Sequence, residues 1–286
     1  MKDGIILIDK EEGMTSRAVD NALGKKFGTR KIGHLGTLDP FATGLLILAI
    51  NKGTKFLPYI DDSSKTYIAS LKLGIKTSTG DRDGEEVIRK EIPPIDEEMI
   101  RKCFASFIGE SYQTPPMTSA IKIDGVPLYK RAHKGEEIER KPRRIEVFSL
   151  DLLSFHEDNL LFSCTVSKGT YIRVLGEDIA EKLGTVGYLD NLRRMKISSF
   201  HVGNAKKIDE ISEDDILEPT PFINALKHIN VKENEVEKIK NGMSYASNID
   251  HGEMILLCHE DKALAVYKKN HKKEGKTIYV SERGLF

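Results

Sequence analysis

A single acid, Asp39, stands in the glycine-rich stretch GHLGTLDPFATG, residues 33–44. No second acid and no cluster of metal-ligating side chains lies near it in the sequence. Because Asp and Pro both favour turns, one interpretation of Asp39-Pro40 is a turn and nothing more. The chemical interpretation is one oriented carboxylate that does covalent or electrostatic work at the anomeric carbon of a sugar. That chemistry suits a leaving group that stays bound, whereas ordinary glycoside hydrolysis needs two carboxylates.

Arg173 is an unexpected residue type for its position. It falls in the first turn of an expected helix over 170–184, where the helix dipole disfavours a cation. One interpretation is an arginine that faces solvent. The other is an arginine directed from the start of the helix at Asp39, which would keep that acid ionised and oriented in a site emptied of water.

Tyr67 belongs to the segment KTY at the start of an expected strand, where it could simply fill space. A tyrosine ring with a polar tip also offers a flat surface for a planar base. Such stacking is worth about 1–3 kcal/mol per base. This is comparable with the few kcal/mol needed to flip a base out of its stack.

The sequence lacks the familiar patterns of other active sites. It has no GxxxxGKS/T, GxGxxG or GxSxG motif and no CxxC or HExxH spacing. Residues 79–87 hold Asp81, Asp83 and Gly84, but the register of a calcium loop would then begin at Thr79 and close at Lys90, so we expect a hairpin turn. The sequence therefore shows no ligand pattern typical of a zinc or calcium site.

The three cysteines, Cys103, Cys164 and Cys258, are far apart and are expected to be buried, apolar-type residues rather than disulfides or zinc ligands. The N-terminal segment has one short apolar run between charges, which does not resemble a signal peptide. No stretch approaches the length of a membrane span. We expect a protein of the reducing cytoplasm.

Charge is balanced overall but unevenly distributed. Lysine and arginine total 44, as do aspartate and glutamate, yet bases concentrate in 122–144 and 168–207, and 208–218 is acidic without a base. Charge runs usually lie on solvated surface, although a basic face also binds nucleic-acid phosphates. The side chains predicted to contact an RNA backbone are Lys122, Lys130, Arg131, Arg143, Arg144, Arg193 and Arg194.

Hydrophobic patterning predicts an α+β fold, since strands and helices alternate irregularly. Strands are expected over 4–8, 45–50 and 65–74, and two more within 145–166. Helices are expected within 14–28, capped by Thr15 or Ser16, and over 96–109, with Met99, Cys103 and Phe107 on one buried stripe. The third is the helix over 170–184, with Thr170 as its cap and Gly184 as its stop.

The acidic segment is the best candidate for a boundary in the chain. We expect a catalytic domain over 1–207, an acidic linker over 208–224 and a small β-rich module over 225–286. Short strand-like runs at 254–267 and 276–281 indicate the β content of this module.

Several motifs together resemble the bacterial tRNA pseudouridine synthase B (TruB) family. The GHxGxLDPxAxG pattern at 33–44 is the most specific of them, and the tail resembles a PUA-type RNA-binding module only in outline. The matching stretches are GIILIDKEEGMTS (4–16), RKIGHLGTLDPFATGLLILAINKGTKF (30–56), KTYIASLKLG (65–74), TPPMTSAIKIDGVPLYKRAHKG (114–135) and SKGTYIRVLGEDIAEKLG with the later LRR (167–194).

The resemblance implies a role for each matching residue. Asp39 would be the catalytic aspartate, which attacks the ribose or assists glycosidic cleavage, and Arg173 would pair with it. Tyr67 would stack on the target base near its C5 proton. The remaining roles are pocket lining by Tyr171 and Leu192, opening of the T-loop by His34, and a mainly structural role for Lys10.

The resemblance also implies a reaction, in which uridine 55 in the T-loop of tRNA becomes pseudouridine. The expected partner is the tRNA T-stem-loop, and we expect a monomer with no required protein partner, no membrane and neither cofactor nor metal. The chain departs from the family pattern at Glu11, where proline is usual, and within 184–200.

Two other functions remain open from the residues. One is an RNA-binding or tRNA-folding protein, whose activity could also accompany catalysis. The other is a nucleoside hydrolase, which would release free uracil and would need a base to activate water. The short tail argues against the guide-RNA-dependent, dyskerin-type enzymes.

Overall fold

The computed structural model describes residues 2–119, 121–123, 125–132 and 134–285. The strands of the larger sheet are β1 (Gly4–Lys10), β2 (Ile32–Leu35), β3 (Thr43–Ile50), β4 (Ser64–Leu73), β7 (Gly109–Gln113), β10 (Arg143–His156), β11 (Asn159–Ser167), β12 (Gly187–Ile197) and β13 (Phe200–His201). The strands of the smaller sheet are β14 (Lys227–Asn230), β15 (Tyr245–Ser247), β16 (Met254–His259), β17 (Lys262–Lys273) and β18 (Lys276–Gly284). Two hairpins pair β5 (Ile75–Thr77) with β6 (Glu86–Arg89) and β8 (Lys122–Ile123) with β9 (Val126–Pro127).

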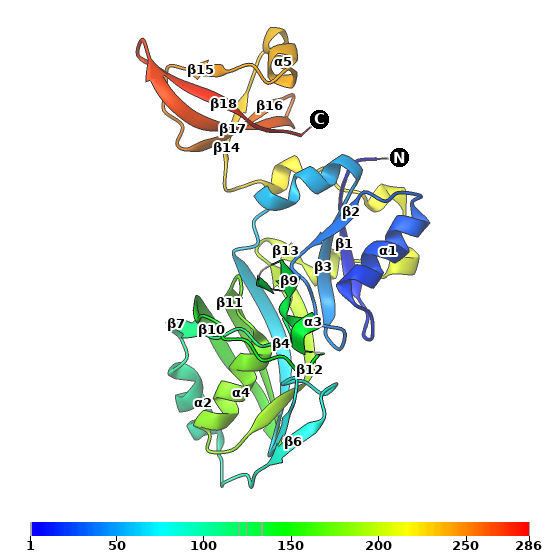
Figure 1. Ribbon diagram of the computed structural model, residues 1–286, viewed down its shortest axis with the longest axis vertical. Coiled ribbons are helices and arrows are strands. Elements are labelled where there is room, and N and C mark those ends of the chain that lie inside the picture. Colours follow the sequence, from blue (N-terminus) through cyan, green and yellow to red (C-terminus); the bar gives the residue numbers. More distant parts are fainter. Residues whose placement is uncertain (1, 120, 124, 133, 286) are drawn as a thin grey trace.

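The larger sheet has the order β1-β3-β12-β4-β11-β10-β7, with β2 paired to β3 and β13 to β12 (Figure 1). Its described pairs are antiparallel except for β12, which runs parallel to β3. This short parallel contact puts Arg194 beside Gly44 and so joins two segments far apart in the sequence. The expected α+β class is confirmed, and the sheet is mixed and largely antiparallel.

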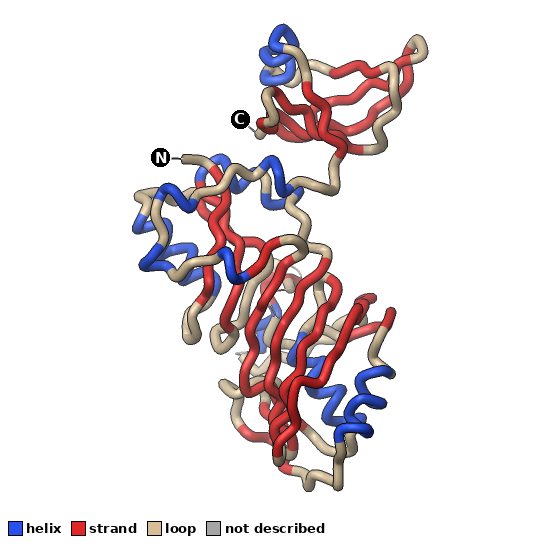
Figure 2. The backbone as a smooth tube through the Cα atoms, turned by 180° about the vertical axis from the view of Figure 1, so that it is seen from behind, coloured by secondary structure: helices blue, strands red, loops and turns tan. Residues whose placement is uncertain are grey.

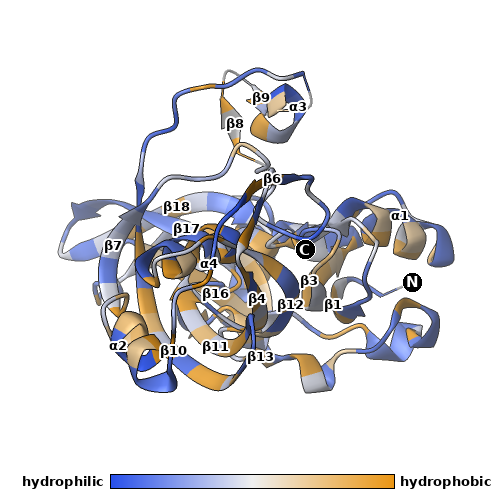
Figure 3. Ribbon diagram, turned by 90° about the horizontal axis from the view of Figure 1, so that it is seen from below, coloured by the Kyte–Doolittle hydropathy of each residue, from blue (hydrophilic) through white to orange (hydrophobic). Residues whose placement is uncertain are grey.

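Two of the described helices cover one face of this sheet (Figure 2). The helices are α1 (Ser16–Lys26), α2 (Glu97–Ala105), α3 (Leu128–Ala132), α4 (Ile172–Lys182) and α5 (Glu233–Lys240). Seen from behind, the sheet lies in front of α2 and α4, which pack on its other side (Figure 2). The segment with β8, β9 and α3 projects away from the body (Figure 3). The space between this segment and the sheet is where the candidate site lies.

The strand pattern explains the main core. Alternate residues of β11, namely Leu160, Phe162, Cys164 and Val166, are buried against the helices, as their spacing predicts. Ile172, Leu175, Ile179 and Leu183 meet them from α4. All three cysteines are buried and unpaired, which confirms their expected apolar role.

The helix expected over 96–109 is shorter than predicted; Cys103 is buried and Phe107 packs against the core, as expected. It spans Glu97–Ala105, and Asp96 caps it by accepting a hydrogen bond from the Met99 amide at 2.8 Å. Met99 is 44% exposed, so its predicted place on the buried stripe is wrong. The buried residues are Ile100, Cys103 and Phe104, whose three- and four-residue spacing fits the face directed at the sheet.

Thr170 is not the cap of α4, contrary to the prediction. The N-cap residue is Tyr171, whose amide donates to Gln113 Oε1 at 2.8 Å while Gln113 Nε2 donates to the Tyr171 carbonyl at 3.1 Å. The helix therefore has no side-chain cap, and a side chain from β7 instead holds the backbone of its N-cap residue. Gly184 follows the helix with a φ of 89°, as a stop of this kind requires.

The segment 208–224, expected as an acidic linker, is not a free connection. Ile211 and Ile216 are buried among residues of β1, β3 and α1. The Ile5 amide donates to the Leu217 carbonyl at 3.0 Å, and the Leu217 amide donates back at 2.8 Å. The acids lie outward on short 3-10 turns. The acidic composition of the segment therefore gives no sign that Ile211 and Ile216 anchor it.

The smaller sheet and α5 form a unit with its own core, which includes Val236, Ile255, Tyr267 and Tyr279. A second cluster joins this unit to the rest of the chain, because Phe56 packs with Ile223, Leu256, Val266 and Leu285. No helix among the described residues is long and apolar enough to cross a membrane.

Candidate active site

Asp39 lies in the loop between β2 and β3, and neighbouring segments hold that loop in place. Lys10, fully buried at the end of β1, donates from Nζ to the carbonyls of Glu11, Met14 and Pro40 at 2.9, 2.7 and 3.2 Å. Burial lowers the pKa of Lys10 to about 8, with Asp39 acting in the opposite direction. Ser16 Oγ accepts from the Leu38 amide at 2.9 Å. The Lys10 contacts agree with its expected structural role.

Arg194 holds the other side of the same loop. Its guanidinium donates to the carbonyls of Gly36, Thr37 and Leu45 at 2.8, 3.4 and 2.8 Å, and the residue is 1% exposed. A Cβ on Gly44 would lie 2.3 Å from the Arg194 carbonyl oxygen, and the φ of Gly44 is 100°, so only glycine fits there. The prediction that Arg194 contacts an RNA backbone is wrong, because its donors are used inside the protein.

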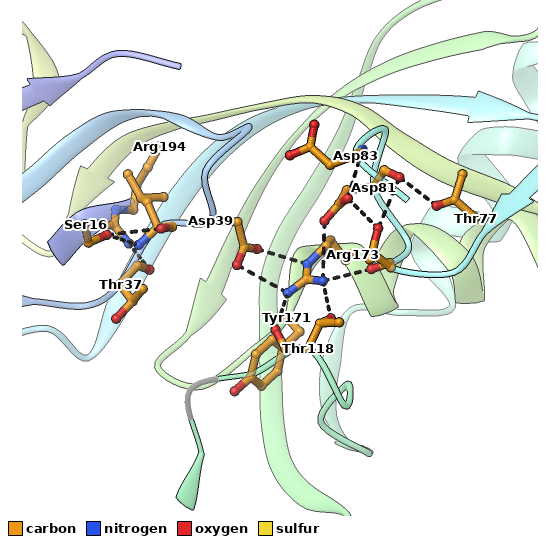
Figure 4. Close-up of polar contacts among 12 residues, drawn as sticks. Ser16, Thr37, Asp39, Thr77, Asp81, Asp83, Thr118, Tyr171, Arg173 and Arg194 are labelled. Carbon is orange, nitrogen blue, oxygen red and sulfur yellow. Dashed lines mark hydrogen bonds and ion pairs between the residues drawn. The ribbon is translucent and has the colours of Figure 1, made fainter. Parts of the chain in front are cut away.

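Asp39 and Arg173 form an ion pair through two nitrogens (Figure 4). Arg173 Nε lies 3.0 Å from Asp39 Oδ2, and Nη2 donates to Oδ1 at 3.3 Å. The Arg173 side chain is 4% exposed, so the solvent-facing interpretation is wrong. The Asp39 side chain remains 35% exposed, which leaves it accessible to a substrate.

The far side of the Arg173 guanidinium is also fully engaged. Nη1 donates to the Thr79 carbonyl at 2.8 Å and to Thr118 Oγ1 at 2.6 Å, and it lies 3.4 Å from Asp81 Oδ2. Burial raises the pKa of Asp81, while the hydrogen bond from Thr79 opposes that shift. One buried cation is therefore shared between a buried carboxylate and an accessible one.

Sequence reasoning missed Asp81 as a partner of this site. It treated 79–87 as a hairpin turn, which the antiparallel pairing of β5 with β6 confirms. The hairpin brings Asp81 to β12, where its backbone pairs with that of Leu189 in an isolated β-bridge. No local pattern separates a buried acid of this kind from the solvated acids that turns usually carry.

A cavity of about 430 Å³ opens beside Asp39 and Arg173. Tyr67, Tyr171 and Leu192, all predicted site residues, line it together with Arg194. Tyr67 and Leu192 are buried, and burial raises the pKa of both Tyr67 and Tyr171. The structure thus brings four predicted site residues to the cavity beside Asp39, namely Tyr67, Tyr171, Leu192 and Arg173. The two tyrosines give the cavity an aromatic wall.

Three further charged residues line this cavity, and none of them was a predicted site residue. Asp62 Oδ1 lies 2.8 Å from Lys168 Nζ, and Asp62 Oδ2 lies 3.4 Å from Lys65 Nζ. Burial lowers the pKa of Lys65, with Asp62 acting in the opposite direction.

His34 does not line the cavity but lies next to it on β2. Its Nδ1 is 3.0 Å from both carboxylate oxygens of Asp20, an α1 residue that is 1% exposed. Its Nε2 is 3.2 Å from Oγ1 of Thr37, which does line the cavity. The imidazole is therefore oriented from behind by a buried acid.

The other side chains predicted to contact the RNA backbone are of two kinds, those with an acidic partner and those exposed to solvent. Arg193 pairs with Asp9 at 2.7 and 2.9 Å, Arg144 pairs with Glu110, and Arg131 lies 3.8 Å from Glu136. Lys130 and Arg143 are exposed. The Lys122 side chain is outside what the structure describes.

No group of three or more His, Cys, Asp or Glu side chains among the described residues could hold a metal ion. The candidate site instead offers one accessible carboxylate, a fixed guanidinium and a buried tyrosine.

Residues 24–172 match the family model described as TruB family pseudouridylate synthase (N terminal domain). The chain is 40% identical over 243 residues to tRNA pseudouridine synthase B of Hydrogenovibrio crunogenus, covering 84% of this chain and 80% of that one. It is 44% identical over 209 residues to the protein of the same name from Syntrophotalea carbinolica, covering 73% and 68%.

Solved structures support the fold. A chain of a Cbf5-Nop10-Gar1 complex aligns with a TM-score of 0.75 and 24% identity, covering 99% of this chain and 85% of that chain. A chain of an H/ACA RNP bound to a substrate RNA containing 2'-deoxyuridine aligns with a TM-score of 0.73 and 22% identity, covering 99% of this chain and 85% of that chain. The pseudouridine synthase fold with a PUA-like module is thereby confirmed.

Proposed function

The chain belongs to the TruB family of pseudouridylate synthases, and we propose that it converts uridine 55 in the T-loop of tRNA to pseudouridine. The observation that best supports this is the accessible Asp39 carboxylate, held by Arg173 at the edge of a cavity with a buried tyrosine. The proposed partner is the T-stem-loop of tRNA, and the proposed reaction needs neither metal nor cofactor.

The substrate uridine enters the cavity as a flipped nucleotide. Flipping costs a few kcal/mol, and stacking on an aromatic ring returns about 1–3 kcal/mol. Tyr67 offers such a ring, and Leu192 provides an apolar wall that excludes water. His34, next to the cavity, contacts the opened loop.

The reaction exchanges one bond of the ribose for another. Asp39 attacks the ribose or assists cleavage of the bond from C1' to N1, and the uracil keeps the electrons of that bond. The freed uracil turns within the cavity and C5 bonds to C1'; where Asp39 has bonded to C1', this step breaks that bond and returns its electrons to the carboxylate. The C5 proton leaves while N1 takes up a proton. Atoms and charge balance without water, which explains why a second catalytic carboxylate is not required.

Arg173 contributes by fixing Asp39 rather than by touching the base. The two contacts from the guanidinium restrict rotation of the Asp39 side chain. Asp39 is therefore ready to act when the ribose reaches it.

We further propose that residues 225–286 contact the same RNA. Exposed lysines follow the end of β17 and the start of β18, including Lys272, Lys273 and Lys276. Lysines grouped in this way favour phosphate binding.

The test uses a T-stem-loop RNA with tritium at C5 of uridine. Wild-type protein should release tritium and no free uracil, whereas Asp39→Asn should release no tritium. With an RNA that carries cytidine at position 55, wild-type protein should release far less tritium. Free uracil would instead indicate a nucleoside hydrolase. Intact RNA binding with no tritium release would overturn the proposal and favour an RNA-folding protein.

A further inference from the structure

A second cavity, of about 500 Å³, is lined by Asp20, which also contacts His34 beside the candidate active site. It is formed by one side of α1, the turn after it and the start of β2. Its lining residues are Arg17, Asp20, Asn21, Gly24, Lys25, Gly28, Thr29, Arg30 and Ile32. We call it the α1 groove.

Three cations face this groove with little compensation. The side chains of Lys25 and Arg30 are exposed and make no hydrogen bond or ion pair within the described part of the chain. Arg17 has one contact, at 3.3 Å to Asp20 Oδ2. Arg193, by contrast, has its charge matched by Asp9.

The acid that lines the groove is already occupied. Asp20 is 1% exposed, and both of its oxygens lie 3.0 Å from His34 Nδ1. Asp20 is therefore engaged by His34 and Arg17, which leaves Lys25 and Arg30 free to attract an anion. Asp20 also links the two cavities, because it lines the α1 groove and contacts His34, which lies next to the active-site cavity.

The helix dipole explains only part of this charge. Lys25 stands in the last turn of α1, where a cation is favoured. Arg17 is in the first turn, where a cation is disfavoured, and Arg30 lies beyond the helix. Gly28 has a φ of 61°, and a Cβ placed on it would meet nothing within 4 Å, so the space between the cations stays open.

We propose that the α1 groove binds phosphodiester groups of the RNA strand that continues from the nucleotides next to His34. This inference rests on the proposed function and adds a binding surface to it. Polynucleotide phosphates suit the groove, because they present regularly spaced anions to several separate cations.

The test compares two triple variants that each remove three cations. The first is Arg17→Gln, Lys25→Gln and Arg30→Gln. The control is Arg89→Gln, Arg101→Gln and Lys102→Gln, whose cations pair with Glu86, Glu97 and Glu98 away from both cavities. Dissociation constants for the T-stem-loop RNA are measured over a range of salt, together with kcat at saturating RNA and the thermal midpoint.

The groove variant should bind about tenfold more weakly at low salt. The log–log salt slope should become shallower by about 0.7–0.9 for each lost phosphate contact, while kcat and the thermal midpoint stay at wild-type values. A dissociation constant and slope equal to those of the control would overturn the inference. Failure of the proposed function looks different, since wild-type protein would then bind RNA without releasing tritium.

Discussion

Asp39 and Arg173 stand 134 positions apart and meet through contacts of 3.0 and 3.3 Å between two nitrogens and two oxygens. The two contacts lie on one edge of the guanidinium, and the opposite edge is tied to Thr79 and Thr118. The pair is thus a rigid bracket between the loop before β3 and the start of α4.

Replacing Arg173 by lysine keeps the charge but removes this bracket. Lysine offers a single nitrogen, so Asp39 should rotate and kcat should fall by about 10²-fold, as misplacement of a reacting group typically does. Single-turnover tritium release at saturating RNA measures the loss. A kcat within a factor of about three of wild type would show that charge alone suffices.

Asp81→Asn should weaken the same bracket from behind. The amide still accepts from Thr79 but turns a charge-assisted contact with Arg173 into a neutral one, a difference of about 1–1.5 kcal/mol or roughly tenfold in kcat. RNA affinity should be unchanged, because Asp81 is buried. A change in affinity without one in kcat would contradict this role.

Lys10 should make activity and stability respond to pH in opposite directions. Its pKa is about 8 in the fold against 10.5 for an ordinary lysine, so the unfolded chain binds more protons between these values and the free energy of unfolding rises with pH. The neutral amine has two N–H donors instead of three, so the Asp39 loop loosens and kcat should fall above about pH 8. Urea unfolding and kcat, followed from below to above that pH, measure both trends. Lys10→Met serves as the control and should show neither trend.

Arg194 and Arg143 should behave differently although both were predicted to contact RNA. Arg194→Met leaves three carbonyls without their donor and should lower the free energy of unfolding by roughly 3 kcal/mol. Arg143→Gln should leave stability unchanged and make the salt slope of RNA binding shallower by about 0.7–0.9. Equal stability for the two variants would contradict the assigned role of Arg194.

Much of the site could be predicted because chemistry-bearing residues sit in unusual local contexts. Asp39 among glycines and Arg173 in a first helical turn both provided a signal, and the structure joins them. Arg194 could also have been placed correctly: it is two residues after the buried Leu192 on β12 and so shares its face. Its place in a run of basic residues instead led to the prediction of an RNA contact.

The remaining features depend on tertiary contacts. Asp81 and Gln113 act on α4 from distant segments, and nothing near them in the sequence specifies that partner. Met99 faces outward because Ile100, Cys103 and Phe104 form the face of α2 that packs on the core. The roles of the site residues, the domain boundaries, the monomeric state and the cytoplasmic location stay predictions.

Phe56 follows β3 and precedes β4, the strand that carries Tyr67, yet its ring packs among residues of the C-terminal unit. Removing residues 225–286 would therefore strip apolar cover from the segment that joins these two strands. A shortened chain with reduced turnover would be ambiguous, since lost RNA contacts and a loosened catalytic framework would give the same reading. Point substitutions on the exposed lysines of β17 and β18 separate the two causes, whereas truncation does not.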